Sequence, residues 1–235
     1  AQEALDKIGA FAEIEGQIDV RHPDRLKDQI ALLPGLIIEN VKADRGLLID
    51  GFTESKLLNI VRETRSCDAC NLKVQDHVRM HMGSKPQFMV ITDSPTYFDG
   101  QAGELMKAKS SNYIKAAMKN AGLSVKNGYF TTLVKAVKPK NQKQLSNSSV
   151  NQCSKYLDRE IELLKPPIII ACGGKAIRHL VPGVKGGFEE LNGQVHYRAD
   201  VDCNIILSIN PQIIYMRPEA QDLLNDSFGL IADLL

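Results

Sequence analysis

NQCSKYLDREIELLKPPIIIACGGKA, at residues 151–176, is the stretch that decides the fold. Residues 151–165 are predicted to form a helix, and residues 166–174 contain an apolar run typical of a short buried strand. The two glycines at the end of that run predict a tight turn, and residues 175–181 predict another helix. A buried strand between two helices is the building unit of a sheet that carries helices on its faces.

The same alternation extends in both directions along the chain. Further strands are predicted at residues 86–94, 129–137 and 203–211, and further helices at residues 103–122 and 218–235. Strands that alternate with helices form parallel sheets covered on both faces. The sequence therefore predicts an α/β fold with three layers, α/β/α, around a central parallel sheet of about four strands. Residues 138–149 and 181–194 are predicted loops, and a hairpin is one alternative for the second.

The first 63 residues are expected to form a helical extension, and residues 64–235 the α/β domain. Apolar residues recur at three-to-four spacing in residues 3–11 and 23–42, which is the spacing of one helix face. Residues 53–66 predict a further helix close to the boundary.

Bulk composition excludes several classes of protein. The formal net charge of the 235 residues is +1, so nucleic-acid binding would need a local basic patch. No apolar run approaches the roughly 20 residues that span a membrane, and no membrane partner is expected. The five cysteines are an odd number in a sequence with cytoplasmic character, which favours metal ligands or free thiols over disulfides. We expect a cytoplasmic protein of a bacterium or a phage-infected host.

An ordered set of motifs resembles the uracil-DNA glycosylase superfamily. The set comprises the Cys-x-x-Cys at residues 67–70, GQAGELM at 100–106, TTLVKAVKP at 131–139, the stretch at 151–178 and INP with a later Arg at 209–217. The match is strongest to the iron–sulfur branch, family four, and covers residues 64–235. The resemblance implies a DNA partner, a role in DNA repair or replication, and hydrolysis of an N-glycosidic bond.

Each motif that carries catalysis in that family is altered here. The first resembles Gly-Glu-x-Pro-Gly, but the chain has Asp93, Ser94 and Pro95, so that Asp93 retains a carboxylate that could position water. Thr132 stands where the family has an asparagine that reads uracil, and a hydroxyl cannot repeat the two-point contact of an amide. Asn210 replaces the family's histidine.

The resemblance places Phe98 where an aromatic ring stacks on the flipped base. Removing one preorganised donor typically costs about 10²–10³ in rate, so three altered groups predict poor uracil excision. Asp93 and Asn210 remain the catalytic candidates, each with an alternative role in holding a turn.

The cysteine motif is an incomplete iron–sulfur site by the same comparison. Cys67 and Cys70 match the first two cluster ligands and Cys153 the last, while Ala136 replaces the third. Four thiolates are the usual ligands of a 4Fe–4S cluster. A cluster with a non-cysteine ligand, a zinc site completed by His77 or His81, and a site without metal all remain open.

Basic residues near the predicted ends of the strands are candidates for DNA contact. Lysines and glycine amides suit phosphates. The resemblance places an apolar wedge that helps expose a base after the Asn-Pro turn, at Ile213, Ile214, Tyr215 and Met216. The candidates are Lys135, Lys138, Lys140, Gly173, Gly174, Lys175, Pro211, Ile213 and Arg217. A solvated charged face is the alternative.

The amino-terminal segment EALDKIGAFAEI, followed by RHPDRL, resembles a short part of bacterial DNA polymerase III alpha subunits. This resemblance implies that the chain is a piece of a polymerase whose other domains are its partners. Three functions remain: a DNA-binding glycosylase-like domain that excises uracil poorly, an active glycosylase of altered base specificity, and a structural domain of a larger polymerase.

Overall fold

The computed structural model describes residues 47, 49–70, 72, 77–108, 111–140, 142 and 144–235. The expected helices within residues 3–42 lie outside the described residues. The described chain belongs to one compact unit that begins at residue 45. None of its described helices is both long enough and apolar enough to cross a membrane.

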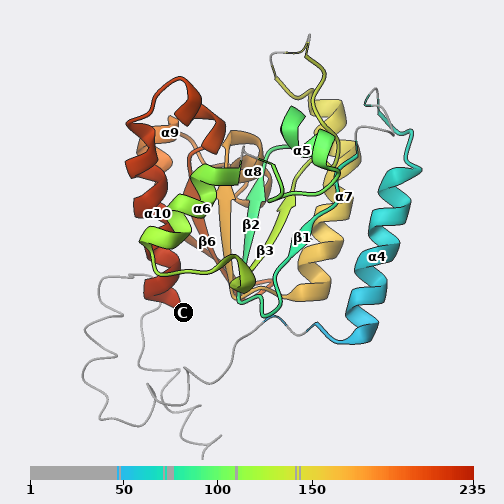
Figure 1. Ribbon diagram of the computed structural model, residues 1–235, viewed down its shortest axis with the longest axis horizontal. Coiled ribbons are helices and arrows are strands. Elements are labelled where there is room, and N and C mark those ends of the chain that lie inside the picture. Colours follow the sequence, from blue (N-terminus) through green and yellow to red (C-terminus); the bar gives the residue numbers. More distant parts are fainter. Residues whose placement is uncertain are drawn as a thin grey trace, which may run out of the picture. The chain divides into compact units, whose positions relative to one another are not determined.

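A six-stranded sheet forms the centre of this unit, in the order β1-β3-β2-β4-β6-β5 (Figure 1). Its strands are β1 (His81–Met82), β2 (Phe88–Thr92), β3 (Gly128–Thr132), β4 (Ile168–Cys172), β5 (Val195–Arg198) and β6 (Cys203–Ser208). The four central strands pair in parallel, which confirms the predicted core of the sheet. The two edge strands pair antiparallel, and the sequence did not predict β1.

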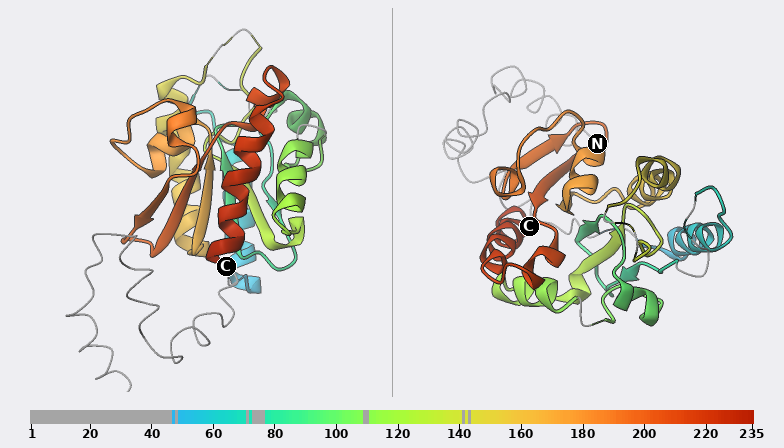
Figure 2. Two further views of the ribbon diagram at one scale, coloured as in Figure 1. Left: turned by 90° about the vertical axis from the view of Figure 1, so that its left-hand side faces the viewer. Right: turned by 90° about the horizontal axis from the view of Figure 1, so that it is seen from above.

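Helices cover both faces of the sheet, giving the predicted three layers (Figure 2). The long helices are α4 (Gly51–Arg65), α6 (Asn112–Asn120), α7 (Asn147–Leu164) and α10 (Ala220–Leu234), and the short ones are α5 (Tyr97–Ala102), α8 (Gly174–Leu180) and α9 (Phe188–Leu191). One apolar core lies between the sheet and α7 with α8, and α4 packs on the outside of α7. A second core lies between the sheet and α6 with α10.

The helix predicted at residues 103–122 is too long. Gly103 has φ of +69° and ends α5, and Met106 also has positive φ, at +65°. Left-handed backbone interrupts a right-handed helix, so α6 begins only at Asn112. The strand predicted at residues 129–137 likewise ends early, at Thr132. The hairpin considered for residues 181–194 is wrong, because this segment contains the helix α9, and the antiparallel pair of β5 and β6 begins only at Val195.

A buried ion pair joins the sheet layer to α7. The Lys135 Nζ lies 2.8 Å from Glu160 Oε2 and 2.7 Å from the Thr131 hydroxyl. The Lys135 and Glu160 side chains are only 5% and 3% exposed. Charges withdrawn from water need such partners, because an isolated buried charge is strongly unfavourable.

Replacing one member of this pair should destabilise the fold. Lys135→Met leaves the Glu160 carboxylate buried without its counter-charge, and we expect a loss of about 3–5 kcal/mol in the free energy of unfolding. The double variant with Glu160→Met should recover most of that loss. Urea denaturation measures both.

A neighbouring surface pair on α7 provides the control. Arg159 binds Glu63 of α4 through both guanidinium nitrogens, with side chains 42% and 47% exposed. Arg159→Ala should cost less than about 1 kcal/mol. If Arg159→Ala and Lys135→Met lowered the free energy of unfolding equally, the cost of breaking an ion pair would not depend on its burial.

Candidate functional site

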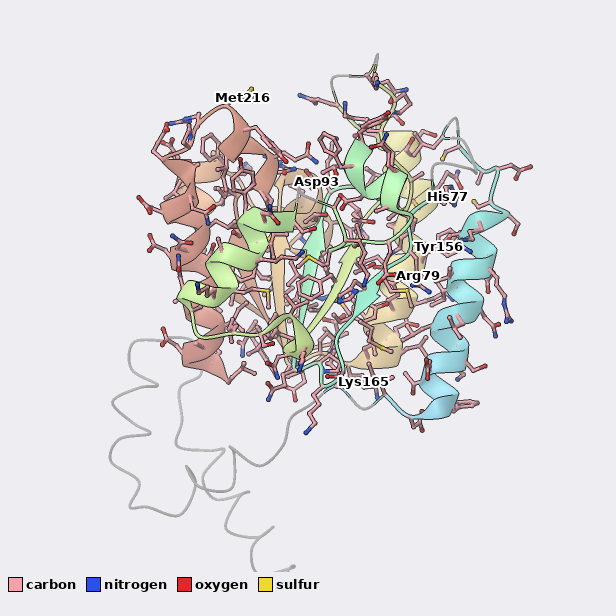
Figure 3. All side chains as sticks on the ribbon, in the orientation of Figure 1. His77, Arg79, Asp93, Tyr156, Lys165 and Met216 are labelled. Carbon is pink, nitrogen blue, oxygen red and sulfur yellow. The ribbon has the colours of Figure 1, made fainter. Side chains whose placement is uncertain are left out.

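One carboxylate connects the ends of three central strands. Asp93 directly follows β2, and its Oδ1 accepts hydrogen bonds from the backbone N–H groups of Lys175 (3.0 Å) and Ala176 (2.8 Å) at the start of α8. Its Oδ2 accepts a longer bond, 3.4 Å, from the side-chain amide of Asn210. Figure 3 shows Asp93 at the upper edge of the sheet, where the parallel strands end. The structure thus brings together the two catalytic candidates.

Gly173 makes this approach possible. It has φ of +121°, and a Cβ at this position would lie 2.6 Å from Asp93 Oδ2. Any side chain would therefore strain the backbone and displace the carboxylate. The glycine pair was expected to expose amides to a DNA phosphate, but the amides that follow it bind Asp93 instead.

The amide of Asn210 is also engaged within the protein. Its Oδ1 accepts the backbone N–H of Gln212 at 2.9 Å, and its Nδ2 donates to Asp93. Asn210 therefore caps the 3₁₀ helix η4 (Pro211–Tyr215). Both roles considered for Asn210 remain chemically accessible, because these contacts leave one N–H and one lone pair of the amide oxygen for a ligand.

Burial raises the pKa of Asp93 above the ordinary aspartate value, and the bonds from Ala176, Asn210 and Lys175 only partly oppose this. Loss of water disfavours the charged carboxylate, while hydrogen bonds to it favour ionisation. A carboxyl with a raised pKa at a strand end is a candidate acid or base.

A pocket opens beside this carboxylate, between the end of β2 and the starts of α5, α6 and η4. Three predicted residues line it: Ser94, Asn210 and Pro211. Polar side chains that the sequence did not single out also line it, namely Thr96, Asp99, Ser111 and Gln212. Asp99 is buried and accepts hydrogen bonds from the backbone and hydroxyl of Thr96. The Thr-x-x-Asp spacing at the start of α5 is a capping-box signal that could have identified this pair.

The other predicted base contacts do not line this pocket. Phe98 lies on α5 with half of its side chain exposed, and Thr132 is buried at the end of β3. Pro95 is buried between β2 and α5. Of the residues described, the pocket therefore combines the first and third motifs but not the aromatic ring.

The predicted DNA contacts divide between surface and core. Lys135 is buried with Glu160, so its position argues against a DNA contact. Lys138 donates to the Gln142 carbonyl, Lys140 lies over the Tyr97 ring, and Lys175 donates to Asn147 Oδ1. Arg217 pairs with Glu189 and Glu219, and Gly174 accepts a bond from Arg178.

The loop after Asn210 exposes only some of the residues expected as a wedge. Ile213 is partly buried against the α6–α10 core, and Ile214 is fully buried. Met216 is 81% exposed, and the Tyr215 ring packs edge-on against Tyr113. Figure 3 shows Met216 at the tip of this loop, above Asp93. Met216, not Ile213, is therefore the most exposed large apolar side chain of this loop.

The three candidate cluster cysteines lie near one another. Cys67 and Cys70 both act electrostatically on Cys153, whose thiol pKa is raised, mainly by burial. The Cys153 Sγ accepts the Lys135 backbone N–H at 3.2 Å, and the Tyr156 hydroxyl bonds to Cys67. Ala136 is buried and pairs across an antiparallel bridge with His77.

These residues do not fit a four-thiolate cluster. Within the described ranges, no group of three or more His, Cys, Asp or Glu side chains has the geometry to hold a metal ion. A methyl group at Ala136 supplies no ligand. Cys172 and Cys203 are fully buried, and burial raises the pKa of each thiol to about 12, as expected for apolar core residues.

Comparisons with known proteins agree with this geometry. Residues 80–228 match the family model described as "Uracil DNA glycosylase superfamily". A type-4 uracil-DNA glycosylase of Archaeoglobus fulgidus is 23% identical over 188 residues, which cover 75% of this chain and 92% of that protein.

Polymerases are also among the relatives. A DNA polymerase III subunit alpha of Yersinia pestis is 31% identical over 236 residues, covering 100% of this chain but 20% of that protein. A DNA polymerase of Bacillus phage SP01 is 22% identical over 157 residues, 64% of this chain and 16% of that protein. The polymerase resemblance expected from the amino-terminal segment is therefore also seen.

The raised pKa of Asp93 predicts a pH-dependent contribution to stability. A carboxyl with a raised folded-state pKa stabilises the fold at low pH, and this stabilisation is lost as pH rises from the unfolded pKa of about 3.9 through the folded one. Asp93→Asn keeps an oxygen to accept the α8 amides but does not ionise. The stability of the wild type relative to Asp93→Asn should therefore fall as pH rises from 3 to 7, measured by urea denaturation. If the stability difference between the wild type and Asp93→Asn were constant or grew with pH, burial would not be the main influence on the pKa of Asp93.

Proposed function

Because the chain belongs to the uracil DNA glycosylase superfamily, we propose that it is a DNA-binding glycosylase-like domain that excises uracil poorly and acts in DNA repair or replication. The observation that carries this proposal is the double engagement of Asn210. The amide oxygen caps η4 and the amide nitrogen binds Asp93, so the residue in the position of the family's histidine stabilises a turn. Groups held in this way are costly to redirect toward a leaving base.

The surroundings of the pocket support a DNA partner. Tyr215 and Met216 are exposed and follow the pocket residue Gln212. Tyr97 is exposed at the start of α5, next to the pocket residue Thr96, and Lys140 lies over its ring. Exposed apolar side chains suit insertion into a base step or stacking, and a lysine suits the backbone. We propose Met216 as the wedge in place of Ile213.

The proposal predicts binding without efficient excision. The chain should bind uracil-containing oligonucleotides with an affinity that falls as salt concentration rises, measured by fluorescence anisotropy. It should release uracil at least about 100-fold more slowly than the Archaeoglobus relative assayed beside it, since one lost donor costs about 10²–10³. Comparable rates in the two proteins would overturn the proposal.

An active glycosylase of altered specificity is the second candidate. It is favoured by Asp93 Oδ2, to which Asn210 donates over a long 3.4 Å, leaving capacity to bind a water molecule. Oligonucleotides with hydroxymethyluracil or hypoxanthine test it, because an abasic product from either would identify the substrate. Asp93→Asn should abolish that product while preserving the contacts to α8.

We propose that the domain works as part of a DNA polymerase III alpha-like protein. The Yersinia relative supports this, because it matches the whole of this chain within 20% of its own length, and so does the phage polymerase. A purely structural role in such a polymerase is the third candidate, and it alone expects no DNA binding by the isolated chain.

A single substitution, Ala136→Cys, should allow the chain to bind an iron–sulfur cluster. The chain as it stands has Ala136 where the related family has its third cluster cysteine, and we expect no 4Fe–4S cluster after anaerobic reconstitution with iron and sulfide. Ala136→Cys supplies the missing thiolate and should yield the visible absorbance and iron content of a cluster. Ala136→Ser is the matched control, because it adds a group of similar size that is a poor iron ligand. Cluster formation in the unaltered chain would contradict this prediction.

A further inference from the structure

Helix α5 presents two adjacent aromatic rings to solvent. Tyr97 is 49% exposed and Phe98 is 50% exposed. Their ring centroids lie 5.8 Å apart with an interplanar angle of 71°, an edge-to-face contact. The Gln101 side chain donates to the Tyr97 hydroxyl at 3.0 Å. The Tyr97 ring is thus held from two sides, and it buttresses the Phe98 ring.

A positive charge is fixed beside these rings. The Lys140 Nζ lies 4.4 Å from the centroid of the Tyr97 ring, within the range of a cation–π interaction. The segment that carries Lys140 packs closely on α5, because a Cβ on Gly100 would lie 2.6 Å from a methyl carbon of Val137. Gly100 therefore brings the lysines that follow β3 against the aromatic pair.

The Phe98 ring does not serve the interior of the pocket. It is not part of the pocket wall, although Thr96 and Asp99 on either side of it are. Lys140 already occupies one face of Tyr97, so Phe98 offers the ring available to a ligand. An exposed aromatic ring next to a lysine matches a base and its phosphate.

We propose that Phe98, supported by Tyr97 and Lys140, binds an unpaired nucleotide outside the pocket, so that the domain prefers single-stranded over duplex DNA. The bases of a duplex already stack on one another, whereas an unpaired base has a free face for Phe98. Lys140 contacts the adjacent phosphate. This inference rests on the proposed DNA binding and specifies the form of DNA that is bound.

The test compares fluorescein-labelled oligo-dT with a hairpin duplex of equal charge, using the full 235-residue chain and anisotropy at several salt concentrations. The wild type should bind the single strand more tightly. Phe98→Ala should lower the ratio of single-strand to duplex affinity by about 10-fold, as expected for one base–aromatic stack. Phe98→Trp should restore the ratio. Lys140→Gln should reduce the salt dependence for the single strand by about 0.7 in the log–log slope.

The matched control is a similar pair on another part of the molecule. Phe52 is 67% exposed and carries Lys56 over its ring at 4.1 Å. Phe52 is the second residue of α4, which begins at the bottom of the view in Figure 3, whereas Asp93 lies at the top of the sheet. Phe52→Ala should leave the affinity ratio unchanged.

The outcomes separate this inference from the proposed function. Binding of both DNA forms with a ratio that does not respond to Phe98→Ala would overturn the inference alone and leave the aromatic pair to a protein partner. An equal loss in Phe98→Ala and Phe52→Ala would also overturn it. Absence of binding to either form would overturn the proposed function and the inference together.

Discussion

The candidate site depends on the Asp93 carboxylate, which holds together the segments that follow the central strands. It binds Lys175, Ala176 and Asn210, which follow Asp93 in the sequence by 82, 83 and 117 positions. The first two lie at the start of α8, after β4, and the third follows β6. Burial makes its charged form costly, and the amides it binds recover part of that cost. The same carboxylate holds both the side chain of Asn210 in the pocket and the first turn of α8. A substitution at Asp93 therefore changes the polar groups of the pocket and the position of α8 together.

The sequence predicted the interior of this fold better than its borders. The strand at residues 168–172 is fully buried, and the buried residues of α7 recur at the three-to-four spacing of one helix face, so their patterns were clear. β1 has two residues and β5 alternates between exposed and half-buried side chains, which leaves no apolar pattern to detect. The break between α5 and α6 depends on positive φ at Met106, a residue type that gives no such warning.

The sequence predicted which residues belong to the site but not which of them contact one another. Asp93 and Asn210 stood out at strand ends, yet their hydrogen bond joins parts of the chain that only the fold brings together. Lys135 was expected at the surface because lysine is seldom buried. Its partner Glu160 lies two helical turns beyond Cys153 on the buried face of α7, and no local pattern links the two charges.

The edges of the sheet have a consequence for a domain related to segments of long polymerases. One edge is the two-residue β1, and the other is β5, which places His196 and Arg198 among its four side chains. Short or charged edge strands are poor templates for pairing with another chain. A sheet bordered in this way resists strand exchange with other polypeptide segments, a property that suits a domain whose polymerase relatives are several times longer.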